Sequence, residues 1–251
     1  MGTKSILLAT LVVIVCGEHM SNGHRISHPR IWHHDYLARS GLRQAIDRLL
    51  LERNLLRDKP TIVDFGCGER PYEFIFTAAG CKYVACDLDG PVDVKIIPGQ
   101  SLAIPDNSVD GVVSFQVLEH VWDIDLYLRE CHRILKPGGW LLLSTHGTWL
   151  YHPHPTDFRR WTRPGLEDEI KARGLTNETT IPVAGPLAWT LLVRLIAYRE
   201  VLRKIPVLGP MLVAPLAVIM NLRAKLEDAL TPEEVRSTNA SIYVTLSRKD
   251  A

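Results

Sequence analysis

Two glycines separated by one residue follow a short apolar run in the first third of the chain. The run Thr61–Phe65 leads into Gly66 and Gly68, with Cys67 as a small residue between them. Glycine lets the backbone approach a ligand closely because no Cβ stands in the way. Asp87, at the end of the next apolar run, can accept two hydrogen bonds from ribose hydroxyls. This spacing predicts a turn that binds a nucleoside.

The residues around this turn separate two classes of cofactor. A dinucleotide site needs a third glycine and a helix N-terminus that faces a pyrophosphate. Arg70 and Pro71 stand there instead. The pattern Asp-x-Gly-x-Gly, which begins at Asp64, suits a cofactor without phosphates that carries a sulfonium and an amino-acid end. Asp64 would position its ammonium group directly or through water. A nicotinamide-dependent reductase stays open as a further hypothesis.

A second group of polar and aromatic residues lies in the segment 146–162. Imidazole and carboxylate groups suit proton transfer, and aromatic rings beside a carboxylate suit the recognition of a sugar-like molecule. We predict His154 and Asp157 as the catalytic pair, with His146 as the next candidate. The alternative is that Asp157 pairs with Arg160 and only holds the segment in place.

These residues must be positioned by a regular scaffold, and the chain alternates short apolar runs with helical patterns. Strands are predicted over residues 61–65, 82–86, 92–97, 110–115, 140–145, 178–183 and 241–247, and helices over 36–56, 72–79, 125–135 and 162–173. This alternation predicts an α/β fold: a doubly wound, mostly parallel seven-stranded sheet with helices on both faces. Ligands bind beyond the carboxyl ends of the strands in such a sheet.

Composition restricts the partners of the protein. The 251 residues are 46% hydrophobic and carry a net charge of +1, so we expect no nucleic-acid partner. The five cysteines have no metal-ligand spacing, and the five histidines in 17–34 read as part of a solvated loop, so no metal site is predicted. Buried, reduced thiols are typical of the cytoplasm, where we expect this protein.

Four segments are expected along the chain: an apolar and loop extension (1–34), a cofactor-binding core (35–185), an apolar helical insertion (186–230) and the final strand of the core (231–251). The apolar run 6–16 is too short to span a bilayer, which needs about 20 residues. Prolines interrupt the insertion and predict two short helices. Peripheral contact of 186–222 with the inner face of the membrane is our preferred interpretation, and a lid or a dimer contact is the alternative.

Four stretches resemble the class I S-adenosylmethionine-dependent methyltransferases, in the branch called type 11. They are VDFGCGERPY (63–72), VACDLDG (84–90), LAIPDNSVDGVVSFQVLEHV (102–121) and RECHRILKPGGWLLLSTH (129–146). The resemblance implies that the first turn lines the methionine part of S-adenosylmethionine, Asp87 binds the ribose, Leu102 lies against the adenine and Gln116 faces the sulfonium. The full cofactor set is Asp64, Gly66, Cys67, Gly68, Asp87, Leu88, Leu102 and Gln116.

The function that this resemblance implies is methyl transfer to a nucleophile, expected to be oxygen, of a small-molecule, glycan-linked or lipid-linked acceptor. The alternative is a catalytically silent cofactor-binding module that acts as a membrane or partner adaptor. One departure from the family concerns the adenine: the segment 97–100 shortly before Leu102 has no acidic residue, so the hydrogen bond would come from Gln100 or from the backbone. Lys136–Gly139 is interpreted as a structural turn, and Glu119 as either a local cap or a site residue.

Overall fold

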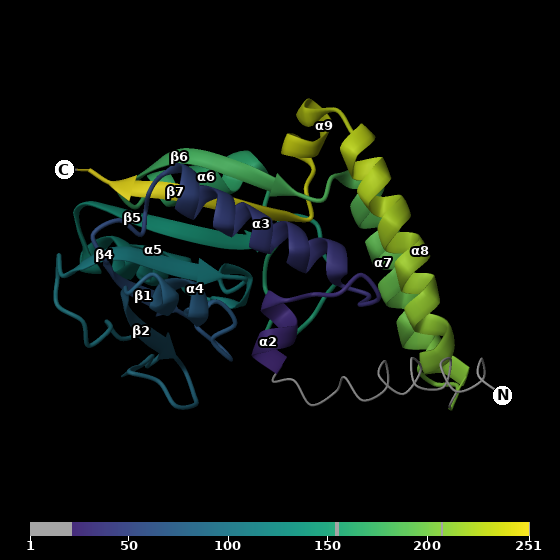
Figure 1. Ribbon diagram of the computed structural model, residues 1–251. Helices are drawn as coiled ribbons and strands as arrows, with labels where there is room; N and C mark the ends of the chain where they lie inside the picture. Colours follow the sequence, from purple (N-terminus) through teal and green to yellow (C-terminus); the bar gives the residue numbers. More distant parts are fainter. Residues whose placement is uncertain (1–21, 154–155, 207, 251) are drawn as a thin grey trace.

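The computed structural model describes residues 22–153, 156–206 and 208–250 (Figure 1). Its centre is one seven-stranded sheet in the order β3-β2-β1-β4-β5-β7-β6. The strands are β1 (Thr61–Phe65), β2 (Lys82–Asp87), β3 (Val94–Lys95), β4 (Val109–Phe115), β5 (Leu135–His146), β6 (Leu175–Val183) and β7 (Ile242–Lys249). Strands β1 to β5 pair in parallel, and β7 is antiparallel to both β5 and β6. The predicted fold class is confirmed.

Helices cover both faces of the sheet. They are α2 (Asn22–Ser27), α3 (Tyr36–Glu52), α4 (Glu73–Ala78), the 3-10 turn η2 (Leu118–His120), α5 (Ile124–Ile134), α6 (Arg163–Lys171), α7 (Pro186–Leu202), α8 (Leu208–Leu230) and α9 (Glu233–Thr238). Successive strand residues point to opposite faces. Ile62 therefore packs in a core with α3, α4 and α7, and its neighbour Val63 packs in a second core with α5 and α6.

Local predictions differ from the structure in several places. The predicted loop over 17–34 is wrong for Asn22–Ser27, which form helix α2. Strand β5 begins at Leu135 rather than Trp140, but its pairing with β4 jumps from Leu135 to Trp140, so the four residues between them stay outside the ladder. Gly138 has a φ of 75° in that stretch, as a tight turn requires.

The insertion forms a two-helix hairpin that stands at one end of the sheet (Figure 1). Helices α7 and α8 are 17 and 23 residues long, which is longer than the short helices predicted. Pro186 occupies the first turn of α7, where a missing N–H costs nothing, and Pro215 lies inside α8. The Asn221 amide ties α8 to the segment before α3, donating to the carbonyl oxygens of Ile31 and His33 at 2.8 and 2.9 Å. No helix within the described ranges has the length and apolar character needed to cross a bilayer.

Candidate active site

A cavity of about 1050 Å³ opens beyond the carboxyl ends of the parallel strands. This is the edge at which doubly wound sheets bind ligands. The strand order reverses between β1 and β4, and residues that follow both strands line the cavity. All the predicted cofactor residues except Asp64 contribute to its wall.

The backbone conformation of the turn after β1 requires glycine at Gly66. Gly66 has a φ of 87°, and a Cβ there would lie 2.6 Å from Val117 Cγ2. The amide nitrogens of Gly66 and Cys67 both donate to the carbonyl oxygen of Cys86, at 2.8 and 3.0 Å, which fixes the turn against β2. Burial raises the pKa of the Cys67 thiol to about 12, so this residue is no nucleophile at neutral pH.

Gly68 and Asp87 together form the part of the site that fits a ribose. Gly68 has a φ of 52°, and no atom lies within 4 Å of its would-be Cβ, so its outer side is open to a ligand. Its amide nitrogen donates to Asp87 Oδ2 at 2.6 Å, and the Leu88 amide donates to Asp87 Oδ1 at 2.6 Å. The carboxylate is thereby oriented, and each oxygen keeps a second lone pair for a hydroxyl.

Asp64 lies behind the turn and does not line the cavity. Its side chain is buried, and Oδ2 accepts a hydrogen bond of 2.6 Å from the Tyr83 hydroxyl. Burial raises the pKa of this carboxyl to about 7, because a charge there is poorly solvated. Any contact with a cofactor ammonium would therefore run through water or through the turn.

The predicted adenine side is held by an acidic residue that sequence reasoning missed. The Leu102 amide donates to Glu130 Oε2 at 2.7 Å, and Arg133 donates to the carbonyl oxygens of Leu102 and Ile104 at 3.1 and 2.8 Å. Both charged residues lie on α5, three residues apart, and form an ion pair of 2.8 Å. The i, i+3 spacing of Glu130 and Arg133 was the available signal. Gln100 lines the cavity as expected.

Gln116 stands at the end of β4 in a left-handed conformation with a φ of 58°, which is unusual for a residue with a side chain. Its backbone amide donates to the Ser144 carbonyl at 2.9 Å, and its side-chain nitrogen donates to Ser144 Oγ at 3.0 Å. The side-chain oxygen is buried without a hydrogen-bond partner. Such strain concentrates at functional sites, and this residue lines the cavity where the sulfonium is expected.

Three imidazoles line the far part of the cavity, and we call His120, His146 and His152 the histidine wall. His146 and His152 pack edge to face with ring centroids 4.9 Å apart, and His120 and His152 do so at 5.1 Å. His146 also stacks on Trp149 at 4.8 Å. Burial holds the pKa of His146 well below its usual value, so this ring is neutral near pH 7.

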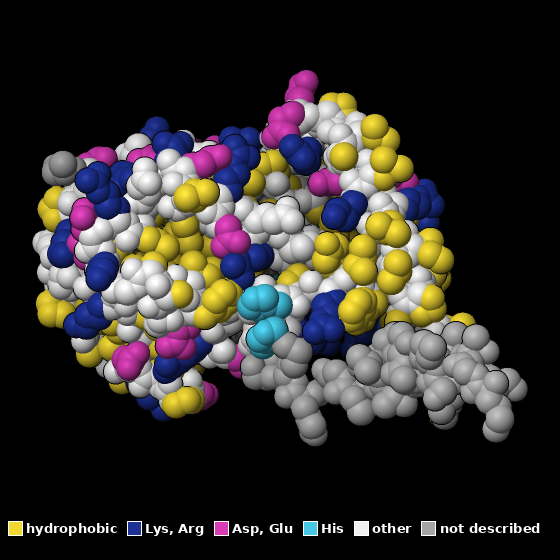
Figure 2. Space-filling view, in the orientation of Figure 1, with side chains coloured by type: hydrophobic (Ala, Val, Ile, Leu, Met, Phe, Trp, Pro, Cys, Tyr) yellow, Lys and Arg dark blue, Asp and Glu magenta, His cyan; other side chains and the backbone are white. Residues whose placement is uncertain are grey.

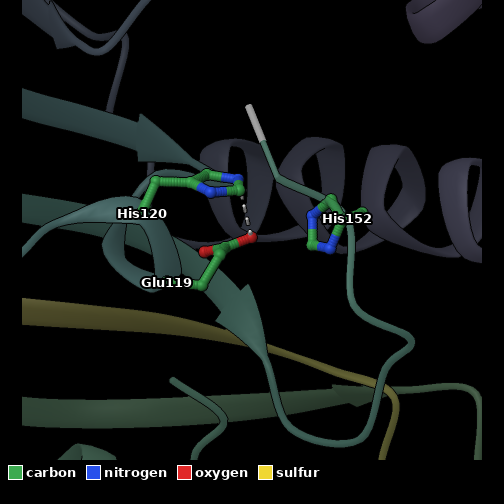
Figure 3. Close-up of side chains that lie close together, drawn as sticks. All are labelled: Glu119, His120 and His152. Atoms are coloured by element: carbon green, nitrogen blue, oxygen red, sulfur yellow. Dashed lines mark ion pairs between the residues drawn. The ribbon is translucent and has the colours of Figure 1, made fainter. Parts of the chain in front are cut away.

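Glu119 is fully buried. Its carboxylate lies beside the imidazoles of His120 and His152 (Figure 3). Its Oε2 accepts a hydrogen bond of 2.8 Å from the Thr145 hydroxyl. Its Oε1 makes no hydrogen bond, and the nearest imidazole atoms are Nε2 of His146 at 3.3 Å and Nε2 of His120 at 4.0 Å. Burial raises the pKa of this carboxyl to about 7. A buried acid with an unpartnered oxygen is better interpreted as a site residue than as a local cap.

The predicted catalytic pair is only partly described, because His154 lies outside the described residues. Asp157 has an almost fully buried side chain and does not line the cavity. Arg160 donates to both of its oxygens, at 2.5 and 2.6 Å, and holds the pKa of the carboxyl well below its usual range. Asp157 also accepts a hydrogen bond of 2.9 Å from the His152 amide. This arrangement makes Asp157 a weak proton acceptor and a firm anchor for the loop that carries His152.

The lining of the cavity also includes residues at the start of helix α3, to which the sequence analysis assigned no role in the site. Asp35, Ala38 and Arg39 line the cavity, and Arg39 Nε lies 2.8 Å from Asp35 Oδ2. Tyr72 and Phe115 complete the apolar side, with ring centroids 5.0 Å apart. No local spacing links α3 to the glycine turn, so only the folded chain brings these residues together.

Comparisons with known proteins indicate a methyltransferase. A family model described as a methyltransferase domain matches residues 32–177. A probable S-adenosylmethionine-dependent methyltransferase of Mycolicibacterium smegmatis is 30% identical over 139 residues, which cover 49% of this chain and 54% of that protein. A ubiquinone biosynthesis O-methyltransferase of Rhizobium rhizogenes is 33% identical over 99 residues, which cover 34% of this chain and 40% of that protein. The chain thus spans about half the length, or less, of the curated relatives it matches.

Solved structures share the fold at low sequence identity. The cyclase SpnF superposes with a TM-score of 0.56 at 17% identity, covering 98% of this chain and 94% of that one. The 1,6-didemethyltoxoflavin-N1-methyltransferase of Burkholderia thailandensis, solved with S-adenosylhomocysteine, has a TM-score of 0.52 at 16% identity and covers 84% of this chain and 79% of that one. The open outer side of Gly68 and the oriented Asp87 carboxylate fit an adenosyl cofactor. The chain therefore belongs to the S-adenosylmethionine-dependent methyltransferase family, and S-adenosylmethionine is its cofactor.

Proposed function

We propose that the protein transfers a methyl group from S-adenosylmethionine to an oxygen of a small-molecule, glycan-linked or lipid-linked acceptor. The observation that carries this proposal is the continuous cavity that runs from the glycine turn, past Gln116, to the histidine wall. Its volume of about 1050 Å³ stands at the top of the roughly 300–1,000 Å³ range of single-ligand pockets. This leaves room for an acceptor beside the cofactor.

Different residues of the cavity would bind the cofactor and position the acceptor. When bound, S-adenosylmethionine would supply an electrophilic methyl carbon with S-adenosylhomocysteine as the leaving group, and the neutral His146 imidazole would accept the proton that the acceptor hydroxyl loses. Asp87 and the glycine turn hold the cofactor, and Gln116 lines the passage to the acceptor. We place the acceptor oxygen against His146, the predicted catalytic residue that lines the cavity. Alignment of this kind contributes strongly to displacement reactions.

The choice of oxygen has two supports. The Rhizobium rhizogenes relative is named as an O-methyltransferase. Imidazoles and a carboxylate are groups that recognise hydroxyls. Aromatic and aliphatic residues on the other side of the cavity suit the apolar part of an acceptor.

Calorimetry with S-adenosylhomocysteine, followed by a methyl-release assay across fractionated acceptors, tests the proposal. We expect cofactor binding and transfer to a hydroxylated fraction, with His146→Asn lowering turnover and leaving cofactor affinity within twofold. Binding without any transfer would favour the silent adaptor. No binding would leave the proposed activity without a basis.

We also propose that the hairpin α7–α8 contacts an anionic membrane surface. An apolar stripe runs along the exposed side of α8 and is formed by Met211, Pro215, Ile219, Leu222, Leu226 and Leu230. Figure 2 shows hydrophobic side chains gathered over this hairpin. Arg203 and Lys204 are exposed where α7 ends, so basic groups stand beside the apolar stripe. This combination supports interfacial binding to anionic lipid head groups.

A further inference from the structure

We propose that Glu119, His120 and His152 bind a divalent transition-metal ion such as Zn²⁺ at the histidine wall. The three side chains come from η2 and from the loop after β5. One ligand atom from each lies within 4.8 Å of the others. Figure 3 shows the Glu119 carboxylate pointing between the two imidazole rings. No metal is predicted from the sequence, because neither the cysteine spacing nor the histidines of 17–34 match a ligand pattern.

The carboxylate of Glu119 supplies the first argument. A buried polar atom is nearly always paired, and a buried charge needs a counter-charge. Oε2 is paired with Thr145, whereas Oε1 is buried and makes no hydrogen bond. The groups nearest to Oε1 are imidazoles rather than Lys or Arg. A cation bound between the rings would satisfy this oxygen.

The hydrogen bonds of the two imidazoles supply the second argument. His120 Nδ1 is bonded to the Thr156 carbonyl oxygen, and His152 Nδ1 is bonded to the Leu150 carbonyl oxygen at 3.1 Å. A carbonyl oxygen only accepts, so each Nδ1 carries the proton and each Nε2 presents a lone pair. Asp157 Oδ2 lies 3.3 Å from His152 Nδ1 as well. Fixing Nδ1–H by an acceptor in this way is the usual support for a metal-binding histidine.

The donor set indicates the class of metal. Two imidazole nitrogens and one carboxylate oxygen suit Zn²⁺, Co²⁺ or Fe²⁺ better than Mg²⁺ or Ca²⁺, which prefer oxygen ligands. Bonds of about 2.0–2.2 Å require the three side chains to close by roughly 1 Å. His152 lies on a loop and can supply that movement. Three protein ligands leave a coordination position open toward the cavity, as in catalytic rather than structural sites.

The open position gives the ion a role that rests on the proposed function. An acceptor hydroxyl that binds the ion through its oxygen loses its proton more easily, because the cation stabilises the negative charge. The ion would also fix the acceptor oxygen on the side of the cavity that faces Gln116. This assigns to the site acceptors whose nucleophilic atom can bind the ion, such as a hydroxyl oxygen, rather than carbon nucleophiles.

The test uses the full chain, purified without an oligohistidine tag and stripped of metal with a chelator. Zn²⁺ binding is measured by calorimetry and Co²⁺ binding by its visible absorption. The variants are His120→Ala, His152→Ala and Thr145→Val. His132→Ala, on α5 and outside the cavity, is the matched control. Affinity for S-adenosylhomocysteine is measured in parallel for every protein.

We expect one equivalent of metal in the unmodified protein and in His132→Ala. Loss of either histidine ligand should weaken binding by about 100-fold or more, and Thr145→Val by roughly 10–100-fold, as changes next to a metal ligand do. Absence of a Co²⁺ band, or binding that survives both histidine variants, overturns the metal site. Either outcome leaves the proposed function standing if S-adenosylhomocysteine binds, whereas loss of that affinity in the unmodified protein would reject the function instead.

Discussion

The carboxylate of Asp87 accepts a hydrogen bond from the Gly68 amide at 2.6 Å, so the end of β2 and the turn after β1 are joined where a ribose would lie. We expect Asp87→Ala to weaken S-adenosylhomocysteine binding by about 100-fold, because two hydrogen bonds to a charged group are lost. Asp89→Ala is the control, since that carboxylate is 96% exposed only two residues away. Calorimetry measures both. Equal affinities for the two variants would place the ribose elsewhere.

Gly66→Ala and Gly68→Ala should separate stability from cofactor binding. An alanine at position 66 meets Val117 at 2.6 Å in a left-handed backbone, so we expect a loss of about 2–4 kcal/mol in unfolding free energy. Position 68 has open space, so Gly68→Ala should cost about 1 kcal/mol and mainly lower cofactor affinity. Urea denaturation measures the unfolding free energy of each variant, and calorimetry measures its affinity for the cofactor. Partial recovery of stability in Gly66→Ala/Val117→Ala would identify the clash as the cause.

Asp64 should make the cofactor-free protein less stable as pH rises. The folded state raises its pKa from 3.8 to about 7, so the unfolded chain releases this proton first. Stability therefore falls between these two values, by roughly 4 kcal/mol in total. Asp64→Asn removes this titration and should raise the melting temperature at pH 8 but not at pH 4. Thermal denaturation at pH 4 and pH 8 tests this prediction. A melting temperature of Asp64→Asn below that of the unmodified protein at pH 8 would contradict it.

Arg160→Lys should loosen the loop that carries His152. The Arg160 guanidinium donates hydrogen bonds to both carboxylate oxygens of Asp157. A lysine ammonium lacks the planar geometry that this bidentate contact requires. We expect turnover to fall roughly 10–100-fold, as expected for a misplaced reacting group, with S-adenosylhomocysteine affinity unchanged. Arg163→Lys is the control, because Arg163 pairs with Glu167 on α6. Limited proteolysis of the loop gives a readout that does not depend on an acceptor. Identical digestion of the two variants would argue against the anchoring role.

Ile219→Glu/Leu226→Glu should detach the protein from anionic vesicles. Both side chains are exposed on the α8 stripe, 66% and 62% respectively, and each charge removes apolar area that a membrane would bury. We expect vesicle partitioning to fall at least about 10-fold. Val235→Glu on α9 is the control. Light scattering that shows a dimer dissociated by the same substitutions, with no vesicle binding, would replace the membrane by a second copy of the chain.

The residues predicted to bind the cofactor could be grouped from the sequence because their signals are local. Gly66, Gly68 and Asp87 act at the ends of β1 and β2, and a parallel sheet brings neighbouring strand ends to one edge. The spacing alone therefore places the carboxylate beside the turn. Asp64 was harder to place, because a period-two pattern does not tell which buried face a polar residue occupies.

The acceptor half could not be predicted in the same way. Glu119 follows β4, whereas His146 ends β5 and His152 lies beyond it. Their contact depends on the pairing of β4 with β5 and on the anchored course of the following loop, neither of which has a sequence period. The helix α2 was missed because six residues around a glycine give too short a pattern to detect.

The position of β7 has a consequence for how the chain reaches its native state. Strand β7 lies between β5 and β6, and both of those strands are synthesised earlier. The edges of β5 and β6 that pair with β7 therefore stay unpaired until residues 242–249 are made. The apolar hairpin α7–α8 is synthesised in that interval. Before residues 242–249 are made, the chain therefore exposes unpaired strand edges together with the apolar hairpin, and both features make an incomplete chain prone to aggregate.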